Sequence, residues 1–340
     1  MPLLILVLPV AAALLTVALV RALMPLLQRY ALARPNARSS HHVPTPQGGG
    51  IAVLGAALPL AVLAALLIGV PDPPALKELA VVTVAATALA VLGAWDDVRP
   101  LSTTVRLAVQ TLAVAAVVLA AGPESRVLFE LVPPWLEFVL LVVAGVWFVN
   151  LVNFMDGLDW MTVAEFVPAL AFFAVLALVA GDVPPRFALA AALLGALMGF
   201  AVFNKPVARL FLGDVGALPI GLLVGWLMLK LASAGALAAA ILLVLYPVAD
   251  ATITLCRRLA RGEKVWQAHR THFYQRATDS GFSVLKVSGS VFCLNVVLTA
   301  LAFATLVLPP LGQAAAVVLG ALLVAALLWR FGRSPAGSPP

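Results

Sequence analysis

Residues 150–159 read Asn150-Leu151-Val152-Asn153-Phe154-Met155-Asp156-Gly157-Leu158-Asp159, and they directly follow an unbroken apolar run from Phe138 to Val149. If this run is a helix, Asn150, Asn153 and Asp156 recur every three residues and share roughly one face of it. Gly157 is then well placed to end the helix. Because a helix C-terminus already carries partial negative charge, carboxylates there are unfavourable unless they share a cation. The stretch therefore predicts a metal site at the end of an apolar helix, with a solvated helix exit as the alternative.

The rest of the chain is as apolar as this run. Of its 340 residues 63% are hydrophobic and only 11% are charged, and the mean hydropathy is +1.09. This composition excludes an ordinary soluble globule. A bilayer-spanning helix needs about 20 apolar residues. Such runs are centred near residues 11, 59, 85, 113, 144, 171, 195, 223, 246, 296 and 321.

These runs predict an all-α, polytopic membrane protein with about 11 transmembrane helices. The connections between them are mostly short, so residues 1–333 are predicted to form a single transmembrane domain. The proline-rich end, 334–340, is predicted to be a disordered tail. The first run lacks the cleavage signature of a signal peptide, which favours a retained helix.

The positive charges divide unequally between the two faces that eleven spans create. Seventeen of the 21 lysines and arginines fall on one face. The other four, on the opposite face, are Lys77, Arg126, Arg186 and Lys230. The positive-inside rule makes the richer face cytoplasmic. We therefore expect a periplasmic N-terminus, a cytoplasmic C-terminus and residence in the cell inner (plasma) membrane.

Two polar segments precede the 150–159 stretch. The first, His41-His42-Val43-Pro44-Thr45-Pro46-Gln47-Gly48-Gly49-Gly50, comes before a helix expected from Ile51. Its glycine amides could approach a phosphate at the helix N-terminus, or the loop could simply be flexible. The second is the pair Asp96-Asp97. Adjacent carboxylates repel, which suits a general base beside a metal; the alternative is a helix end paired with Arg99 or Arg106.

Two further polar segments follow the stretch. Asp214 lies between two glycines immediately before an apolar run, so it is either a site residue or a helix N-cap. In the segment 257–283, His269, His272 and Arg276 are spaced by three and four, which on a short helix places them on one side. No third thiol or carboxylate at matching spacing supports zinc, and an anion site for phosphates fits better.

All five segments fall on the predicted cytoplasmic face, while the outer loops are comparatively poor in polar residues. Central carboxylates and amides with a basic rim suit a magnesium-bound diphosphate, because both halves balance its charge.

In this order, the segments resemble the polyprenyl-phosphate N-acetylhexosamine-1-phosphate transferase family, glycosyltransferase family 4, over almost the entire chain. The motifs that carry the resemblance are His41…Pro44-Thr45-Pro46…Gly49-Gly50, Asp96-Asp97, Asn150…Asn153…Asp156-Gly157, Gly213-Asp214…Gly216 and His269…His272. The His269-Arg270-Thr271-His272 run resembles the O-antigen-initiating branch rather than the three consecutive histidines of phospho-MurNAc-pentapeptide transferases. Gln47, Trp160 and Ala217 depart from the family pattern, where arginine, glycine and serine are common.

The resemblance implies a Mg²⁺-dependent catalytic domain that transfers a HexNAc-1-phosphate from UDP-GlcNAc or a related UDP-sugar to undecaprenyl phosphate. UMP is released, and the product initiates a lipid-linked cell-surface glycan such as O-antigen. No nucleic acid partner is implied, and a homodimer is left open. The site would lie on the cytoplasmic face.

The resemblance also implies roles by position. Asp96 and Asp97 would deprotonate or orient the lipid phosphate. Asn153 and Asp214 would hold magnesium, supported by Asp156. The residues implied to bind the substrates are Asn150 and Asp159 near the uridine, Thr45 closing the nucleotide pocket, and His269, Arg270, His272 and Arg276 on the phosphate or sugar.

Two alternatives stay open. One is a phospho-MurNAc-pentapeptide transferase. The other is a secondary transporter, since intramembrane carboxylates occur in transporters as well as in membrane-bound transferases. Transporters place charge near the bilayer midplane, whereas here the acidic residues lie at helix ends on one side. Asp250, within the run centred near 246, is the exception, unless it lies near the inner end and faces the site.

Overall fold

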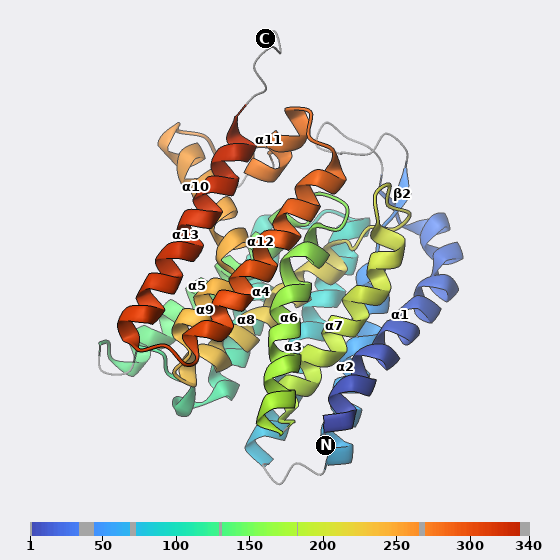
Figure 1. The fold of residues 1–340 in the computed structure, drawn as a ribbon. Helices are drawn as coiled ribbons and strands as arrows, with labels where there is room; N and C mark the ends of the chain where they lie inside the picture. The colour runs from blue at the N-terminus through green and yellow to red at the C-terminus, as the bar shows by residue number, and fades with distance from the viewer. Residues whose placement is uncertain are drawn as a thin grey trace.

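The computed structural model is a bundle of helices (Figure 1) and describes residues 2–33, 44–68, 73–128, 131–181, 183–264 and 269–333. In chain order its long elements are α1 (Pro2–Tyr30), α2 (Gly49–Ile68), α3 (Pro73–Val98), α4 (Thr103–Ala121), α5 (Pro134–Met155), α6 (Met161–Ala180), α7 (Pro185–Asn204), α8 (Asp214–Ser233), α12 (Val284–Thr305) and α13 (Pro310–Gly332). The short ones are β1 (Leu32–Ala33), β2 (Thr45–Pro46), η1 (Pro123–Ser125), α9 (Leu237–Leu243), α10 (Leu245–Ala260) and α11 (Phe273–Asp279). The expectations for His41, His42 and the tail 334–340 lie outside the described residues.

Ten of the described helices are long and apolar enough to cross a membrane. An eleventh candidate is the pair α9 and α10, which is bent by 67°. This confirms the prediction of an all-α, polytopic membrane protein. The span expected near residue 246 is not one straight helix, however. Pro247 lacks an N–H and its ring crowds the carbonyl four residues earlier, that of Leu243, which is where α9 ends.

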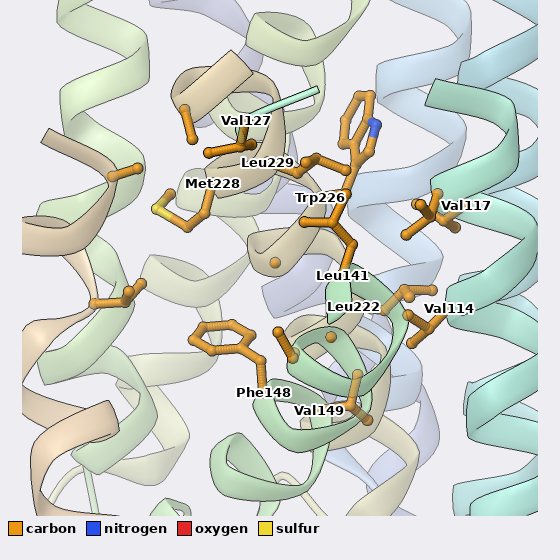
Figure 2. Close-up of a pocket in the computed structure, with 18 of the residues that line it drawn as sticks. Val114, Val117, Val127, Leu141, Phe148, Val149, Leu222, Trp226, Met228 and Leu229 are labelled. Atoms are coloured by element: carbon orange, nitrogen blue, oxygen red, sulfur yellow. The ribbon is translucent and has the colours of Figure 1, made fainter. Parts of the chain in front are cut away.

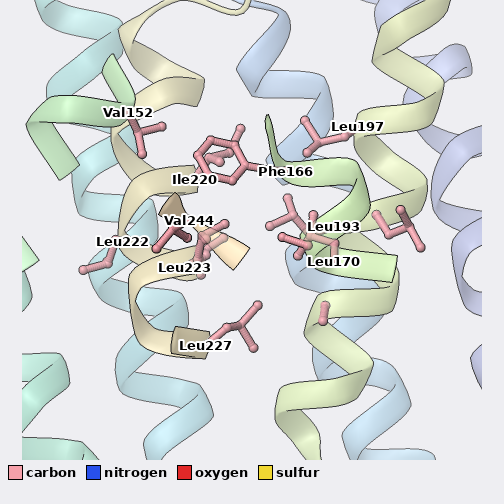
Figure 3. Close-up of a cluster of buried hydrophobic side chains, with 14 of the residues drawn as sticks. Val152, Phe166, Leu170, Leu193, Leu197, Ile220, Leu222, Leu223, Leu227 and Val244 are labelled. Atoms are coloured by element: carbon pink, nitrogen blue, oxygen red, sulfur yellow. The ribbon is translucent and has the colours of Figure 1, made fainter. Parts of the chain in front are cut away.

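Close helix packing in the bundle depends on small residues. A Cβ on Gly195 of α7 would lie 2.0 Å from the carbonyl oxygen of Pro9 in α1, and one on Gly50 would lie 2.2 Å from the Cα of Gly216. Small residues at such crossings let helix backbones approach in a membrane, where lipid tails are as apolar as the side chains. Around these contacts α6, α7 and α8 contribute a core of fully buried aliphatic and aromatic side chains (Figure 3).

The loop before α2 is fixed to the loop before α8. Strands β1 and β2 pair antiparallel, and Gln47 bridges to Phe211. Helix α2 begins at Gly49, two residues before the predicted start, because the amides of Gly49 and Gly50 donate to the carbonyls of Phe211 and Leu212 at 2.9 Å each. In this structure these glycine amides are therefore used for packing.

The described polar segments gather at one end of the bundle, where β2 and α11 lie and where α13 ends (Figure 1). The N-terminus lies at the other end. The alternation of helix directions that the sequence predicts is thus present. Which end faces the cytoplasm stays a prediction.

Candidate active site

The end of α3 meets the start of α8 through the carboxylate of Asp97. Its Oδ1 accepts the N–H of Asp214 at 3.1 Å and its Oδ2 accepts that of Val215 at 3.2 Å. Both amides lie in the first turn of α8, where backbone N–H groups have no partner within the helix. The positive end of the helix dipole also favours a carboxylate at this position. Gly93 permits this approach, since a Cβ on it would lie 2.3 Å from the carbonyl of Asp214. The alternative that Asp214 is an N-cap is wrong: Gly213 occupies that position with φ 78° and Asp214 is the first helical residue.

A third helix, α5, joins these two through Asn153. The Asn153 Nδ2 donates to Asp214 Oδ1 at 2.7 Å. The second carboxylate oxygen of Asp214, Oδ2, lies 3.9 Å from Arg106 Nη2. The structure therefore brings Asp97, Asn153 and Asp214 together from three separate helices, as the sequence predicted for residues of one site.

Asp96 does not face Asp214 as Asp97 does. Its Oδ2 lies 2.7 Å from Arg106 Nη1, and its Oδ1 accepts the N–H of Leu101 at 2.6 Å. Both oxygens of Asp96 thus have protein partners, so the two aspartates occupy different environments. The ion pair with Arg106 was the alternative interpretation of the sequence. The catalytic role of Asp96 stays a prediction.

Asp156 follows directly after α5 and accepts a short hydrogen bond from the Thr162 hydroxyl. Burial raises the pKa of Asp156 from 3.8 to about 7, opposed by the Thr162 bond and reinforced by Asp214, Asp97 and Asp159. Asp156 therefore holds a proton near neutral pH, close to other carboxylates. A cation bound among these groups would favour the ionised form of Asp156.

The donor set here suits magnesium. Carboxylate and amide oxygens of Asp97, Asn153, Asp156 and Asp214 are the hard ligands that Mg²⁺ prefers. Among the described residues, no group of three or more His, Cys, Asp or Glu side chains is arranged to hold an ion by itself.

Three predicted substrate residues lie in packing contacts of the described structure. The amide of Asn150 donates to Gln110 Oε1 at 2.7 Å and to the carbonyl of Val146 at 2.8 Å. Asp159 is buried, and its Oδ2 accepts the N–H of Ala208 at 2.9 Å. Thr45 is buried in β2. Their role in binding a substrate stays a prediction.

The His/Arg segment differs from the expected helix face. His272 is the N-cap of α11 and His269 lies before it, so His269, His272 and Arg276 do not share a face of one helix. The two imidazole rings are nevertheless close, with centroids 4.8 Å apart. The Arg276 Nη2 donates to the carbonyl of Gly332 at 3.1 Å, and the Arg270 Nη2 lies 3.0 Å from Asp279 Oδ1.

Helix α11 is attached to the end of α5 through Tyr274. Burial, followed by Asp250 and Glu165, raises the pKa of Tyr274 well above its ordinary value, so its hydroxyl stays protonated and donates to the carbonyl of Phe154 at 2.8 Å. A Cβ on Gly157 would lie 2.2 Å from that hydroxyl oxygen. The basic segment thus lies against the turn that follows Asn153.

Sequence reasoning did not assign Arg106, Tyr274 or Asp250 to the site. Arg106 was foreseen only as a partner for the Asp96-Asp97 pair. Asp250 was expected either as an exception to the one-sided pattern or as a residue near the inner helix end that faces the site. For Arg106, the available signal was a charged residue in the first turn of a membrane helix. For Asp250, it was a charged residue within a span.

An apolar cavity of about 300 Å³, partly open to the outside, lies between α4, α5, α8 and α9 and extends from Val149 toward Val127 and Leu237, at the end of the bundle opposite the polar cluster. Val149 lines one end, next to Asn150 in α5, and Trp226 lies toward the opposite end (Figure 2). Its walls are aliphatic and aromatic, and so suited to a hydrocarbon chain.

The chain is similar to known proteins over most of its length. The sequence profile of glycosyl transferase family 4 matches residues 79–232, which contain Asp97, Asn153 and Asp214. A probable undecaprenyl-phosphate N-acetylglucosaminyl 1-phosphate transferase of Bacillus subtilis is 27% identical over 78% of this chain and 76% of its own length. A phospho-N-acetylmuramoyl-pentapeptide-transferase of Caldanaerobacter subterraneus is 39% identical, but over only 26% of this chain and 27% of its own length.

The broadest of these similarities is to a decaprenyl-phosphate N-acetylglucosaminephosphotransferase of Mycobacterium tuberculosis. It is 30% identical over 87% of this chain and 80% of its own length. Identity at this level over four fifths of a relative confirms the resemblance expected from the motifs. The chain therefore belongs to glycosyl transferase family 4, the polyprenyl-phosphate N-acetylhexosamine-1-phosphate transferases.

Proposed function

We propose that this chain transfers a HexNAc-1-phosphate, with GlcNAc as the first candidate sugar, from a UDP-sugar to undecaprenyl phosphate or a related polyprenyl phosphate. UMP is the second product. The observation that carries the proposal is the convergence of Asp97, Asn153 and Asp214 from α3, α5 and α8. The names of the bacterial relatives support the choice of sugar and lipid.

In the proposed reaction an oxygen of the lipid phosphate attacks the β-phosphorus of the UDP-sugar. A new P–O bond forms to the lipid, and the bond to the bridging oxygen breaks as UMP leaves with the electron pair. Because phosphoryl transfer demands little covalent chemistry, alignment and charge neutralisation by the protein are the main requirements.

Residues of this chain supply that alignment. Asn153 and Asp214 would hold Mg²⁺, supported by Asp156. When bound, the ion would neutralise charge on the diphosphate. Asp96 and Asp97 orient the lipid phosphate, close to the guanidinium of Arg106. The residues proposed to engage the donor are Thr45, Asn150, Asp159, His269, Arg270, His272 and Arg276.

The lipid is proposed to enter sideways from the inner leaflet of the plasma membrane. A lipid whose phosphate lies at the polar cluster would extend its chain past Val149 into the apolar cavity, toward the other end of the bundle. A volume of about 300 Å³ holds only part of a polyprenyl chain, and the rest would stay in the bilayer. A cytoplasmic active site and the inner membrane location are part of this proposal.

The direct test is to express the chain in membranes and to supply UDP-GlcNAc, Mg²⁺ and undecaprenyl phosphate. We expect UMP and a GlcNAc-pyrophosphoryl lipid, detected by mass spectrometry. EDTA should abolish both products and added Mg²⁺ should restore them. Failure of this donor and of every other UDP-HexNAc to yield UMP and labelled lipid would show that the assignment is wrong.

A second candidate donor is UDP-MurNAc-pentapeptide. The 39% identity to a phospho-N-acetylmuramoyl-pentapeptide-transferase over 87 residues favours including it. The run His269-Arg270-Thr271-His272 argues against it. Both donors should be offered together, and we expect the GlcNAc lipid to dominate. Solute flux in proteoliposomes without any lipid product would instead support a transporter.

A further inference from the structure

Asp250 is a buried carboxylate that no step of the proposed reaction uses. It lies on α10, beyond the bend that follows Leu243, and is 0% exposed. Five groups surround its two oxygens: at Oδ1 the N–H of Phe273 (3.0 Å), the hydroxyl of Thr254 (3.3 Å) and His272 Nδ1 (3.4 Å), and at Oδ2 the N–H of Tyr274 (3.2 Å) and the hydroxyl of Tyr246 (3.2 Å). Three of these five groups belong to the His/Arg segment.

The contact with Asp250 supplies hydrogen-bond acceptors that the start of α11 lacks. Phe273 and Tyr274 are its first two residues, and their N–H groups have no partner within the helix. A helix of seven residues has little stability by itself in any case. The carboxylate of Asp250 satisfies both donors at the positive end of the helix, so it fixes where α11 begins.

The same carboxylate lies beside the imidazole of His272, which is 2% exposed. The ring lies nearly parallel to that of Tyr274, with 18° between the planes and centroids 5.7 Å apart. Phe154 lies on another side, with centroids 6.4 Å apart. His272 is therefore held by Asp250 and by two aromatic rings, and one of these comes from the end of α5.

The other side of α11 is attached to the metal end of α5. The Tyr274 hydroxyl donates to the carbonyl of Phe154, between Asn153 and Asp156, and closely contacts Gly157. A continuous series of contacts thus runs from Asp250 through α11 to the turn that carries the proposed magnesium ligands.

We propose that Asp250 is a positioning residue that acts through His272. The His272 Nδ1 is buried 3.4 Å from Asp250 Oδ1 and has no hydrogen bond in the described structure, so this carboxylate is the acceptor that Nδ1–H faces, and Nε2 is the ring nitrogen left for the phosphate or sugar of the donor. A carboxylate that orients a functional histidine is a general device, and loss of such a partner of a metal-bound histidine costs about 10- to 100-fold. This inference rests on the proposed function, because it takes His272 to act on the donor.

The kinetic test is a double-mutant cycle with Asp250→Asn and His272→Ala. We expect Asp250→Asn to lower kcat by about 10- to 100-fold, with the KM for the lipid changed less than about twofold. The double variant should lose much less than the product of the two single losses, because Asp250 has no imidazole left to orient. Multiplied losses in the double variant would overturn the proposal.

Tyr246→Phe is the matched control. It removes a hydroxyl donor to the same carboxylate but touches neither His272 nor α11 in the contacts above, so turnover should stay within about threefold of wild type. Thermal unfolding in detergent identifies any variant that fails to fold. Asp250→Ser, which keeps an acceptor oxygen without the charge, is the second variant, and a wild-type kcat in both Asp250 variants would also overturn the proposal.

A readout independent of activity is amide hydrogen exchange of residues 273–279 in the purified protein. Exchange should accelerate in Asp250→Asn and not in Tyr246→Phe. Unchanged exchange in Asp250→Asn would show that Asp250 does not hold α11. If the wild-type chain makes no lipid product, the proposed function fails, whereas the exchange result still decides whether Asp250 fixes this helix.

Discussion

One carboxylate oxygen of Asp214 accepts a hydrogen bond from the Asn153 amide, and the other lies 3.9 Å from Arg106. Asp214→Asn keeps the size of the side chain and removes its charge. We expect turnover to fall by at least about 100-fold, because a proposed metal ligand and its charge are lost together. The melting temperature should not fall, since repulsion from Asp97 is relieved.

Both quantities are measured in the same detergent preparation. Glu124→Gln, an exposed change in η1 at the other end of the bundle, is the control and should leave both unchanged. An Asp214→Asn enzyme with wild-type turnover would remove the metal role from this position.

The raised pKa of Asp156 makes a prediction about pH. Its pKa is about 7 in the folded chain against an ordinary 3.8, so the folded state retains a proton that the unfolded state has lost between these values. Metal-free protein should therefore become less stable as pH rises from 5 through 7 and then level off. Mg²⁺ competes with this proton, so its stabilising effect should be larger at pH 8 than at pH 5.5.

Thermal unfolding with EDTA or Mg²⁺ at the two pH values is the measurement. Asp156→Asn should flatten the decline in the EDTA samples. A stabilisation by Mg²⁺ that is equal at both pH values, and equal in the variant, would show that Asp156 is not linked to the metal.

The residue types of the site could be predicted from the sequence, but their surroundings could not. Asn153 and Asp214 stood out because amides and carboxylates are rare at the ends of apolar runs. The same signal singled out Asn150 and Asp159, which in the structure contact Gln110 and the Ala208 amide. Spacing along one chain does not tell which polar group contacts a distant residue of the protein and which faces the reacting substrates.

At the scale of helices, Gly93 sets how closely α3 approaches α8. A Cβ there would lie 2.3 Å from the backbone of Asp214, so Gly93→Ala must push α8 away from Asp97. We expect a loss of stability of about 1–3 kcal/mol, as for other overpacked contacts. Turnover should fall by at least about tenfold because Asp214 moves with its helix.

Gly289→Ala is the matched control. It is also a glycine within a membrane helix, α12, but a Cβ there meets nothing within 4 Å. Thermal unfolding and turnover are compared for the two variants. If Gly93→Ala retained both wild-type values, close contact between α3 and α8 would not be what positions Asp214.

Element boundaries were predictable where local chemistry sets them. The end of α5 just before Asp156 follows from the change from apolar to polar residues and from Gly157. The start of α11 at Phe273 depends instead on Asp250, 23 residues earlier in the chain, because that carboxylate accepts the N–H of Phe273. Tertiary partners of this kind leave no periodic trace, which is why His272 was expected inside a helix rather than before it.

For the whole molecule, hydropathy predicted the spans because a bilayer requires long apolar helices. It also placed the polar segments at one end, since successive spans reverse direction. It could not say that α3, α5 and α8 are neighbours at that end. Their contacts depend on small residues such as Gly93, whose role appears only when the opposing backbone is known.

The remaining prediction for the whole molecule is its orientation in the membrane. Seventeen of 21 basic residues lie on the face predicted to carry the site, so that end should be cytoplasmic. In a background with Cys256 and Cys293 replaced by serine, Arg261→Cys after α10 and Glu124→Cys in η1 place exposed thiols at opposite ends. In intact cells a membrane-impermeant maleimide should label Glu124→Cys alone, whereas inverted vesicles should expose Arg261→Cys. A permeant maleimide should label both variants in intact cells. The reverse pattern would place the carboxylate cluster on the outer face, away from cytoplasmic nucleotide sugars, and would contradict the proposed reaction.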